Sequence, residues 1–85
     1  MEEHATIEFP EFDSLERSTY HGQVWNGMFH GFGRLTWRDG SSYEGNWVDN
    51  FHSGYGVFTY PKSNIVHQYR GQWLEGKKHG RGIVM

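Results

Sequence analysis

Histidine is the residue of this 85-residue chain that most readily suggests chemistry, because imidazole both ligates metals and transfers protons. The chain holds six of them. His30 and His79 occupy equivalent places in two similar stretches, whereas His21, His52 and His67 follow no spacing typical of a metal site. The absence of cysteine excludes thiolate ligands and disulfides. We therefore expect neither a metal site nor a cofactor.

A catalytic centre is not expected either. No serine stands beside a plausible base and acid, and six of the ten acidic residues lie within residues 1–19. The glycine pairs at residues 31–33 and 80–82 lack the third glycine and the strand-to-helix context of a dinucleotide site. These patterns predict a protein that is not an enzyme.

Charge is unevenly distributed along the chain. Residues 1–19 carry a net charge of −5 and residues 20–85 a net charge of +3. The second value is too small for a nucleic-acid footprint, so no nucleic-acid partner is expected. The densest basic patch comprises Lys77, Lys78 and Arg81. Such a patch could bind anionic phospholipid headgroups, and peripheral lipid binding is one functional hypothesis.

These side chains belong to a repeat with a nearly fixed period. Residues 20–33 read YHGQVWNGMFHGFG, residues 43–56 read YEGNWVDNFHSGYG, and residues 69–82 read YRGQWLEGKKHGRG. Counted from the tyrosine, position five holds Val24, Trp47 and Trp73. Three sets of glycines coincide, at positions three, twelve and fourteen: Gly22, Gly45 and Gly71; Gly31, Gly54 and Gly80; Gly33, Gly56 and Gly82.

The three stretches resemble the MORN repeat (membrane occupation and recognition nexus), whose pattern is close to Y-x-G-x-W-x-x-G-K-x-H-G-x-G. The third copy matches every motif position, and the first departs at Val24 and Met28. The second departs at Asn50, Phe51 and Ser53. The resemblance implies a sheet-forming repeat with an interaction role. It also implies association with cytoskeletal, ciliary or membrane-proximal scaffolds inside the cell, in the cytoplasm or at the membrane periphery.

Each copy is expected to form one β-hairpin. Tyr20, Gly22 and Val24 alternate with polar or larger neighbours at a period of two, and Asn26-Gly27 is a strong signal for a tight turn. The sequence therefore predicts an all-β fold, a single-layer antiparallel meander of hairpin repeats. The copies are expected to span residues 20–42, 43–68 and 69–85.

Mid-strand glycine weakens a strand unless another group packs closely against it. We therefore expect large rings to lie flat over the bare backbone of a neighbouring strand. Tyr43 and Trp47 would cover Gly54 and Gly56. The other expected participants in this stack are Tyr20 over Gly31 and Gly33, and Tyr69 and Trp73 over Gly80 and Gly82.

Residues 1–19 are interpreted as a flexible acidic arm, because acidic residues dominate and Pro10 interrupts the apolar ones. The alternative is that Phe9 and Phe12 cover the edge or face of the first copy.

The leading functional hypothesis is a protein-binding scaffold. Phe32, Tyr55 and Val57 alternate with the glycines, so they are expected on the free face of the sheet, beneath a helical or extended partner segment. Ile65 and Val66 lie in a longer loop, residues 61–68, and are further candidate contacts.

The third copy looks shortened, because residues 80–85 supply only the start of its second strand. We expect a longer parent chain, or an edge that a partner or a second copy of the chain covers.

Overall fold

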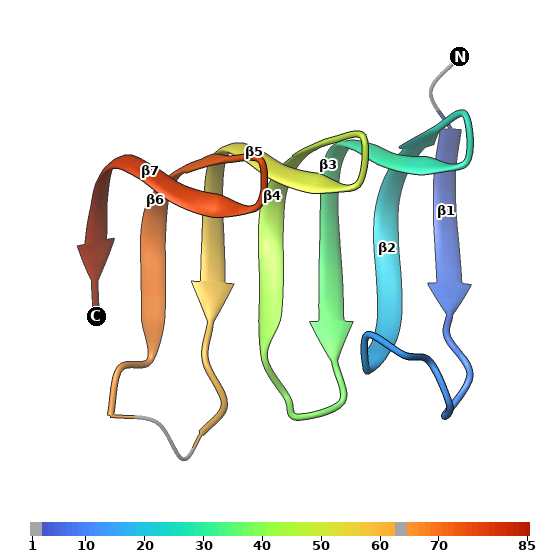
Figure 1. The fold of residues 1–85 in the computed structure, drawn as a ribbon, viewed down its shortest axis with the longest axis horizontal. Coiled ribbons are helices and arrows are strands. Elements are labelled where there is room, and N and C mark those ends of the chain that lie inside the picture. The colour runs from blue at the N-terminus through green and yellow to red at the C-terminus, as the bar shows by residue number, and fades with distance from the viewer. Residues whose placement is uncertain (1–2, 63–64) are drawn as a thin grey trace.

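The computed structural model describes residues 3–62 and 65–85, and all the regular elements in these ranges are β-strands. They form one antiparallel sheet in which the strand order follows the sequence (Figure 1). The predicted all-β meander of hairpins is therefore confirmed. The strands are β1 (Glu3–Glu8), β2 (Arg17–Trp25), β3 (Met28–Trp37), β4 (Ser42–Val48), β5 (Phe51–Thr59), β6 (Gln68–Leu74) and β7 (Lys77–Val84).

Each copy of the repeat is one hairpin: β2–β3, β4–β5 and β6–β7. Both residues of each two-residue turn have positive φ, as a type I′ turn requires. The turn pairs are Asn26-Gly27 (52° and 74°), Asp49-Asn50 (47° and 73°) and Glu75-Gly76 (49° and 82°). The turn predicted at Asn26-Gly27 is therefore confirmed, and Glu75 adopts a conformation that is rare for glutamate.

Each strand from β2 to β7 contributes one glycine that pairs with a glycine of a neighbouring strand, so a row of bare backbone crosses the sheet. A Cβ atom at Gly33 would collide with the Tyr20 hydroxyl, and one at Gly56 would collide with the Tyr43 hydroxyl. The tyrosine rings therefore occupy the space that side chains would fill. The glycine row comprises Gly22, Gly33, Gly45, Gly56, Gly71 and Gly82.

Beyond the glycine row the two strands of each hairpin change register. From the pair Gly22–Gly33 to the pair Val24–Phe29, β2 advances by two residues and β3 by four. The same shift recurs in β4–β5 and β6–β7. Such bulges bend a sheet, and Figure 1 shows the hairpin ends curving over at the upper edge.

Because of the bulges, one part of the predicted ring stack does not form. Gly31, Gly54 and Gly80 have φ of 96°, 77° and 67°, so they serve a backbone conformation that other residues rarely adopt. A Cβ atom there would meet a polar side chain of the neighbouring strand: Gln23, Asn46 or Gln72. The prediction that rings cover these three glycines was therefore wrong.

The tryptophans also lie elsewhere than predicted. Trp47 Nε1 donates a hydrogen bond to the carbonyl of Gly33 (3.0 Å), in the preceding copy. Trp73 Nε1 donates in the same way to the carbonyl of Gly56 (3.3 Å). Each tryptophan therefore links two hairpins, whereas the tyrosine alone covers the glycine within its own hairpin.

The core is a line of rings that runs through all three copies. Trp47 lies edge-on between Tyr20 and Tyr43, with ring centroids 5.9 and 5.1 Å away. Trp73 lies in the same way between Tyr43 and Tyr69, at 5.4 and 5.3 Å. All five side chains are buried. Because each tryptophan contacts two tyrosines, the three copies share one core.

The side chain at position ten of each copy lies over the tyrosine ring of the same copy. Phe29 lies parallel to Tyr20 with centroids 4.0 Å apart, and His52 lies parallel to Tyr43 at 3.8 Å. In the third copy a cation takes this place, since Lys78 Nζ lies 4.7 Å from the centre of the Tyr69 ring.

Each later hairpin turn is tied to the hairpin before it. Asn50 donates its backbone N–H to the Phe29 carbonyl (3.0 Å) and accepts the Phe29 N–H at its side-chain oxygen (2.8 Å). Gly76 N–H bonds the His52 carbonyl (3.0 Å). These bonds fix the curved hairpin ends against one another.

The flexible arm predicted for residues 1–19 was wrong for the described residues 3–19. Glu3–Glu8 is strand β1, and it pairs with β2 from Glu3–Val24 to Glu8–Thr19. Ala5 extends the glycine row, and Ile7 pairs with Tyr20 and packs against the core. A segment with an acidic composition therefore forms an edge strand of the sheet.

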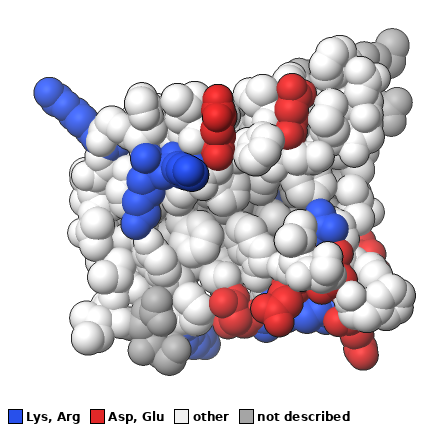
Figure 2. Space-filling model, in the orientation of Figure 1, with Lys and Arg blue, Asp and Glu red and all other residues white. Residues whose placement is uncertain are grey.

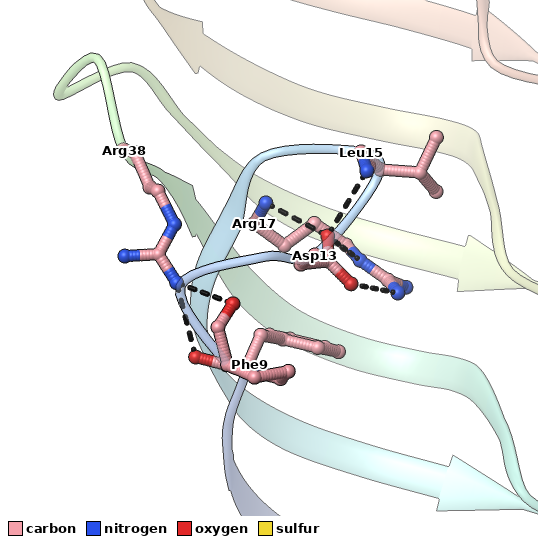
Figure 3. A network of polar contacts seen from close by, with 6 residues as sticks. Phe9, Asp13, Leu15, Arg17 and Arg38 are labelled. Carbon is pink, nitrogen blue, oxygen red and sulfur yellow. Dashed lines mark hydrogen bonds and ion pairs between the residues drawn. The ribbon is translucent and has the colours of Figure 1, made fainter.

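A tight network holds the segment between β1 and β2 (Figure 3). The Asp13 carboxylate accepts hydrogen bonds from Arg17 Nε (3.0 Å) and from an Arg17 terminal nitrogen (2.8 Å). These bonds hold the pKa of the Asp13 carboxyl well below its usual range. Arg38 donates to the carbonyls of Phe9 (3.1 Å) and Pro10 (2.6 Å).

The alternative prediction for this segment holds for only one of its two phenylalanines. Phe9 packs against the core, edge-on to Phe29 with centroids 6.4 Å apart. Phe12 is 87% exposed. The first copy is therefore covered by β1 and Phe9.

Candidate interaction surface

The sheet has two unlike faces. We call the face that carries Tyr20, Tyr43 and Tyr69 the inner face, and the opposite one the outer face. Side chains alternate along a strand, so neighbours of the glycine row such as Phe32 and Tyr55 stand on the outer face. The inner face carries the buried rings of the core, beside a hollow of about 340 Å³ that Phe29, Trp37 and His52 help to line.

The structure places the three predicted partner-binding residues on the outer face of β3 and β5. Phe32 is 54% exposed and Tyr55 is 51% exposed, while Val57 is partly buried. Asn46 lies between the two rings, since it pairs with Phe32 and its amide donates to the Tyr55 carbonyl (3.4 Å). Val57 is in the next row, paired with Glu44 and Arg70.

The outer face is hollowed over β5, β6 and β7, which sequence reasoning did not foresee. An open groove of about 620 Å³ there is lined by Tyr55, Arg70, Gln72, Arg81 and Ile83, together with strand glycines. It combines apolar surface with two guanidinium groups. The period-two alternation around Gly71 and Gly82 was the signal that could have placed Arg70 and Arg81 on this face.

Ile65 and Val66 do not join this surface. They belong to the loop between β5 and β6, at the end of the strands opposite the hairpin turns (Figure 1). Ile65 is 95% exposed and Val66 is 36% exposed. Ser63 and Asn64, in the same predicted contact loop, lie outside the described residues.

The three predicted lipid-binding residues are not brought together on one face. Lys78 donates to the Tyr60 hydroxyl (2.8 Å) and stacks over Tyr69 on the inner face. Arg81 lines the groove of the outer face, and Lys77 pairs with Leu74 beside the third turn. Within the described residues, no helix is long and apolar enough to cross a membrane.

His52 serves the core. Its ring lies parallel to Tyr43 and edge-on to Trp47 and Trp73, with centroids 4.7 and 5.1 Å away. Burial lowers the pKa of His52 to about 4, so the imidazole is neutral near pH 7. In the part of the chain that the structure describes, no three potential ligands gather around a point where a metal ion could bind.

Comparison with known proteins accounts for the repeat. Residues 20–42, 43–65 and 69–84 match the family model of the MORN repeat in three consecutive segments. The chain belongs to the MORN-repeat family. The MORN copies thus begin at the three tyrosines that the sequence period marks, and each copy is one hairpin of the structure.

Two curated proteins illustrate the similarity. The chain is 40% identical over 73 residues to MORN repeat-containing protein 3 of Xenopus laevis, and 32% identical over 69 residues to ALS2 C-terminal-like protein of Bos taurus. The alignments cover 81% and 79% of this chain but only 31% and 7% of those relatives. The chain thus spans less than a third of the length of either relative. MORN-repeat proteins are generally interaction modules.

Proposed function

We propose that this chain is a non-catalytic MORN module that binds another protein through its outer face. The observation that carries the proposal is the pair of half-exposed rings, Phe32 and Tyr55, in one row of that face. Aromatic side chains are enriched in protein–protein interfaces and often dominate their binding energy. The inner face offers less exposed aromatic surface, because its tyrosines and Trp47 and Trp73 are buried against the chain itself.

The groove beside Tyr55 indicates the chemistry of the partner. Arg70 and Arg81 line it, and guanidinium groups favour carboxylates through paired hydrogen bonds. We propose a partner segment that lays apolar side chains on Phe32, Tyr55 and Val57 and directs acidic side chains toward the two arginines. Such a partner would suit a scaffold in a cytoskeletal, ciliary or membrane-proximal assembly.

Replacing Phe32, Tyr55 and Val57 together with alanine tests the proposal. Wild-type and variant chains are immobilised, and the proteins each retains from a cell extract are quantified by mass spectrometry. We expect the variant to lose the retained partner while its circular dichroism spectrum is unchanged, because two of the three side chains are half exposed. The control is Phe12→Ala, which removes an 87% exposed ring away from this face. Equal retention by the triple variant would refute the proposal.

Anionic lipid is the alternative ligand. The division of Lys78 and Arg81 between the two faces favours protein over membrane, since a flat lipid surface cannot meet both faces together. Flotation with anionic vesicles at low salt distinguishes the two: salt-sensitive flotation of the wild-type chain would support the lipid alternative.

Self-association through the sheet edge is a third proposal. Strand β7 pairs with β6 alone among the described strands, so one side of its backbone is free to pair with another chain. Sedimentation at several concentrations tests this, and a monomer throughout would discard it.

A further inference from the structure

The hairpin ends carry a second exposed apolar surface at equivalent positions of the MORN copies. Position six holds Trp25, Val48 and Leu74, which are 37%, 45% and 47% exposed. Across each turn they pair with position nine: Met28, Phe51 and Lys77. Phe51 is 54% exposed. We call the apolar members of this set the hairpin ridge: Trp25, Met28, Val48, Phe51 and Leu74.

The ridge faces away from the core because of strand alternation. Its neighbours at positions five and ten, such as Trp47 and His52, turn toward the ring stack. Val48 and Phe51 therefore point outward on the same hairpin. Val48, Phe51 and Leu74 come from two consecutive hairpins and line one hollow, so they form a contiguous surface, unlike the single exposed apolar residues common on soluble proteins.

The spacing of the ridge matches an α-helix. Adjacent strands lie about 4.8 Å apart, so equivalent positions of successive hairpins recur every ~9.6 Å. Seven residues of an α-helix rise about 10.5 Å, and seven residues bring a side chain back to nearly the same face. In an extended segment, side chains on one face recur every ~6.8 Å, which does not match the ~9.6 Å between equivalent positions of the hairpins. The ridge thus fits a helix that crosses the hairpins.

The ridge also carries charge. Val48, Phe51 and Leu74 line a hollow of about 340 Å³ between the second and third hairpin ends, together with Asp49, Ser53 and Glu75. Figure 2 shows acidic side chains along this upper edge, with basic side chains toward the β7 end. A hollow with apolar walls and two carboxylates fits an apolar side chain that is flanked by Lys or Arg.

We propose that the hairpin ridge binds an amphipathic α-helix of a partner protein. The helix would present apolar side chains at seven-residue intervals and basic side chains toward Asp49 and Glu75. This inference rests on the proposed protein-binding function. It adds a second surface and the structural class of what binds there.

A synthetic peptide tests the proposal. The peptide is an amphipathic helix of about 21 residues, with leucine at heptad a and d positions and lysine beside them. A control peptide has the same composition with the leucines in alternation. Affinity for the full chain is measured by calorimetry. We expect the heptad peptide to bind at least about tenfold more tightly than the control, which corresponds to ~1.4 kcal/mol.

Variants of the ridge locate the binding. Phe51→Ser with Leu74→Ser is expected to weaken binding of the heptad peptide at least tenfold. The matched outer-face variant, Phe32→Ser with Tyr55→Ser, is expected to leave it unchanged. Asp49→Asn with Glu75→Gln should weaken binding at low salt and have little effect at high salt, because exposed charge pairs are screened.

Three outcomes would overturn the inference: equal affinity for the two peptides, binding that survives the ridge variant, or binding to anionic vesicles in place of the peptide. The test also separates this inference from the proposed function. Loss of extract proteins from the triple alanine variant concerns the outer face alone, and peptide affinity concerns the ridge alone.

Discussion

At the scale of single residues, the three copies show how different side chains solve the same packing problem. Phe29, His52 and Lys78 occupy the same place over a tyrosine. A phenylalanine there is fully apolar, and the third-copy lysine keeps its charge exposed at the sheet edge. The histidine is the only one whose protonation conflicts with its surroundings, because its ring lies among buried tryptophans.

His52 should make stability depend on pH. Its folded-state pKa of about 4 lies below the ordinary value of 6.5, so the unfolded chain binds a proton more readily between these values. The stability that neutral His52 contributes is therefore fully present above about pH 6.5, and it is lost as the pH falls toward 4. Urea denaturation should show a loss of about 2 kcal/mol between pH 7 and pH 5.

The first copy supplies the control for this prediction. His52→Phe copies Phe29 and removes the titrating group, so the pH-dependent part of the loss should disappear while the fold is kept. An unchanged pH dependence in this variant would show that His52 titrates normally in the folded protein.

At the scale of elements, the sequence revealed what local chemistry dictates. Asn26-Gly27 predicted a turn, because few residues tolerate positive φ. Strand alternation put Phe32 and Tyr55 on the outer face. Gly31 and its equivalents were misread, because a bulge depends on the register of two strands, which a single strand's pattern does not contain. The groove was missed for a related reason, since it joins side chains from three strands.

Strand β1 was missed because the prediction relied on the acidic composition of residues 1–19 and overlooked their alternating apolar residues. Acidic residues and Pro10 suggested disorder, yet Ala5 and Ile7 alternate with polar neighbours and meet Gly22 and Tyr20 of β2. The segment that returns the chain to β2 is held by Asp13 and Arg17, which lie four residues apart and form an ion pair. That geometry needs a folded turn and cannot be read from spacing alone.

Asp13→Ala should loosen this element without unfolding the rest. The variant removes two hydrogen bonds from the Arg17 side chain and two from backbone N–H groups, at Leu15 and Arg17. We expect backbone amides of β1 to exchange with solvent severalfold faster, since local openings determine exchange at a sheet edge. Amide exchange by NMR measures this, with Glu11→Ala as the exposed acidic control. Unaltered exchange in β1 would mean that strand pairing alone holds the segment.

In the molecule as a whole, one ring stack on one row of bare backbone unites the three MORN hairpins. Tyr43 covers Gly56 in the middle copy, and Trp73 of the third copy bonds the Gly56 carbonyl. Most rings of the inner face are thereby buried against one another, whereas Phe32, Tyr55 and the hairpin ridge have exposed apolar side chains. A substitution in the middle of the glycine row should therefore destabilise the hairpins at both ends of the sheet.

Gly56→Ala probes whether the ring stack unites the hairpins, because its methyl group would overlap the Tyr43 ring. We predict a loss of about 1–3 kcal/mol in urea denaturation, the usual cost of overpacking. Amide protection should fall in β2–β3 and β6–β7 as well as in β4–β5. Unchanged stability, or a loss of protection confined to β4–β5, would show that the three hairpins do not depend on one ring stack.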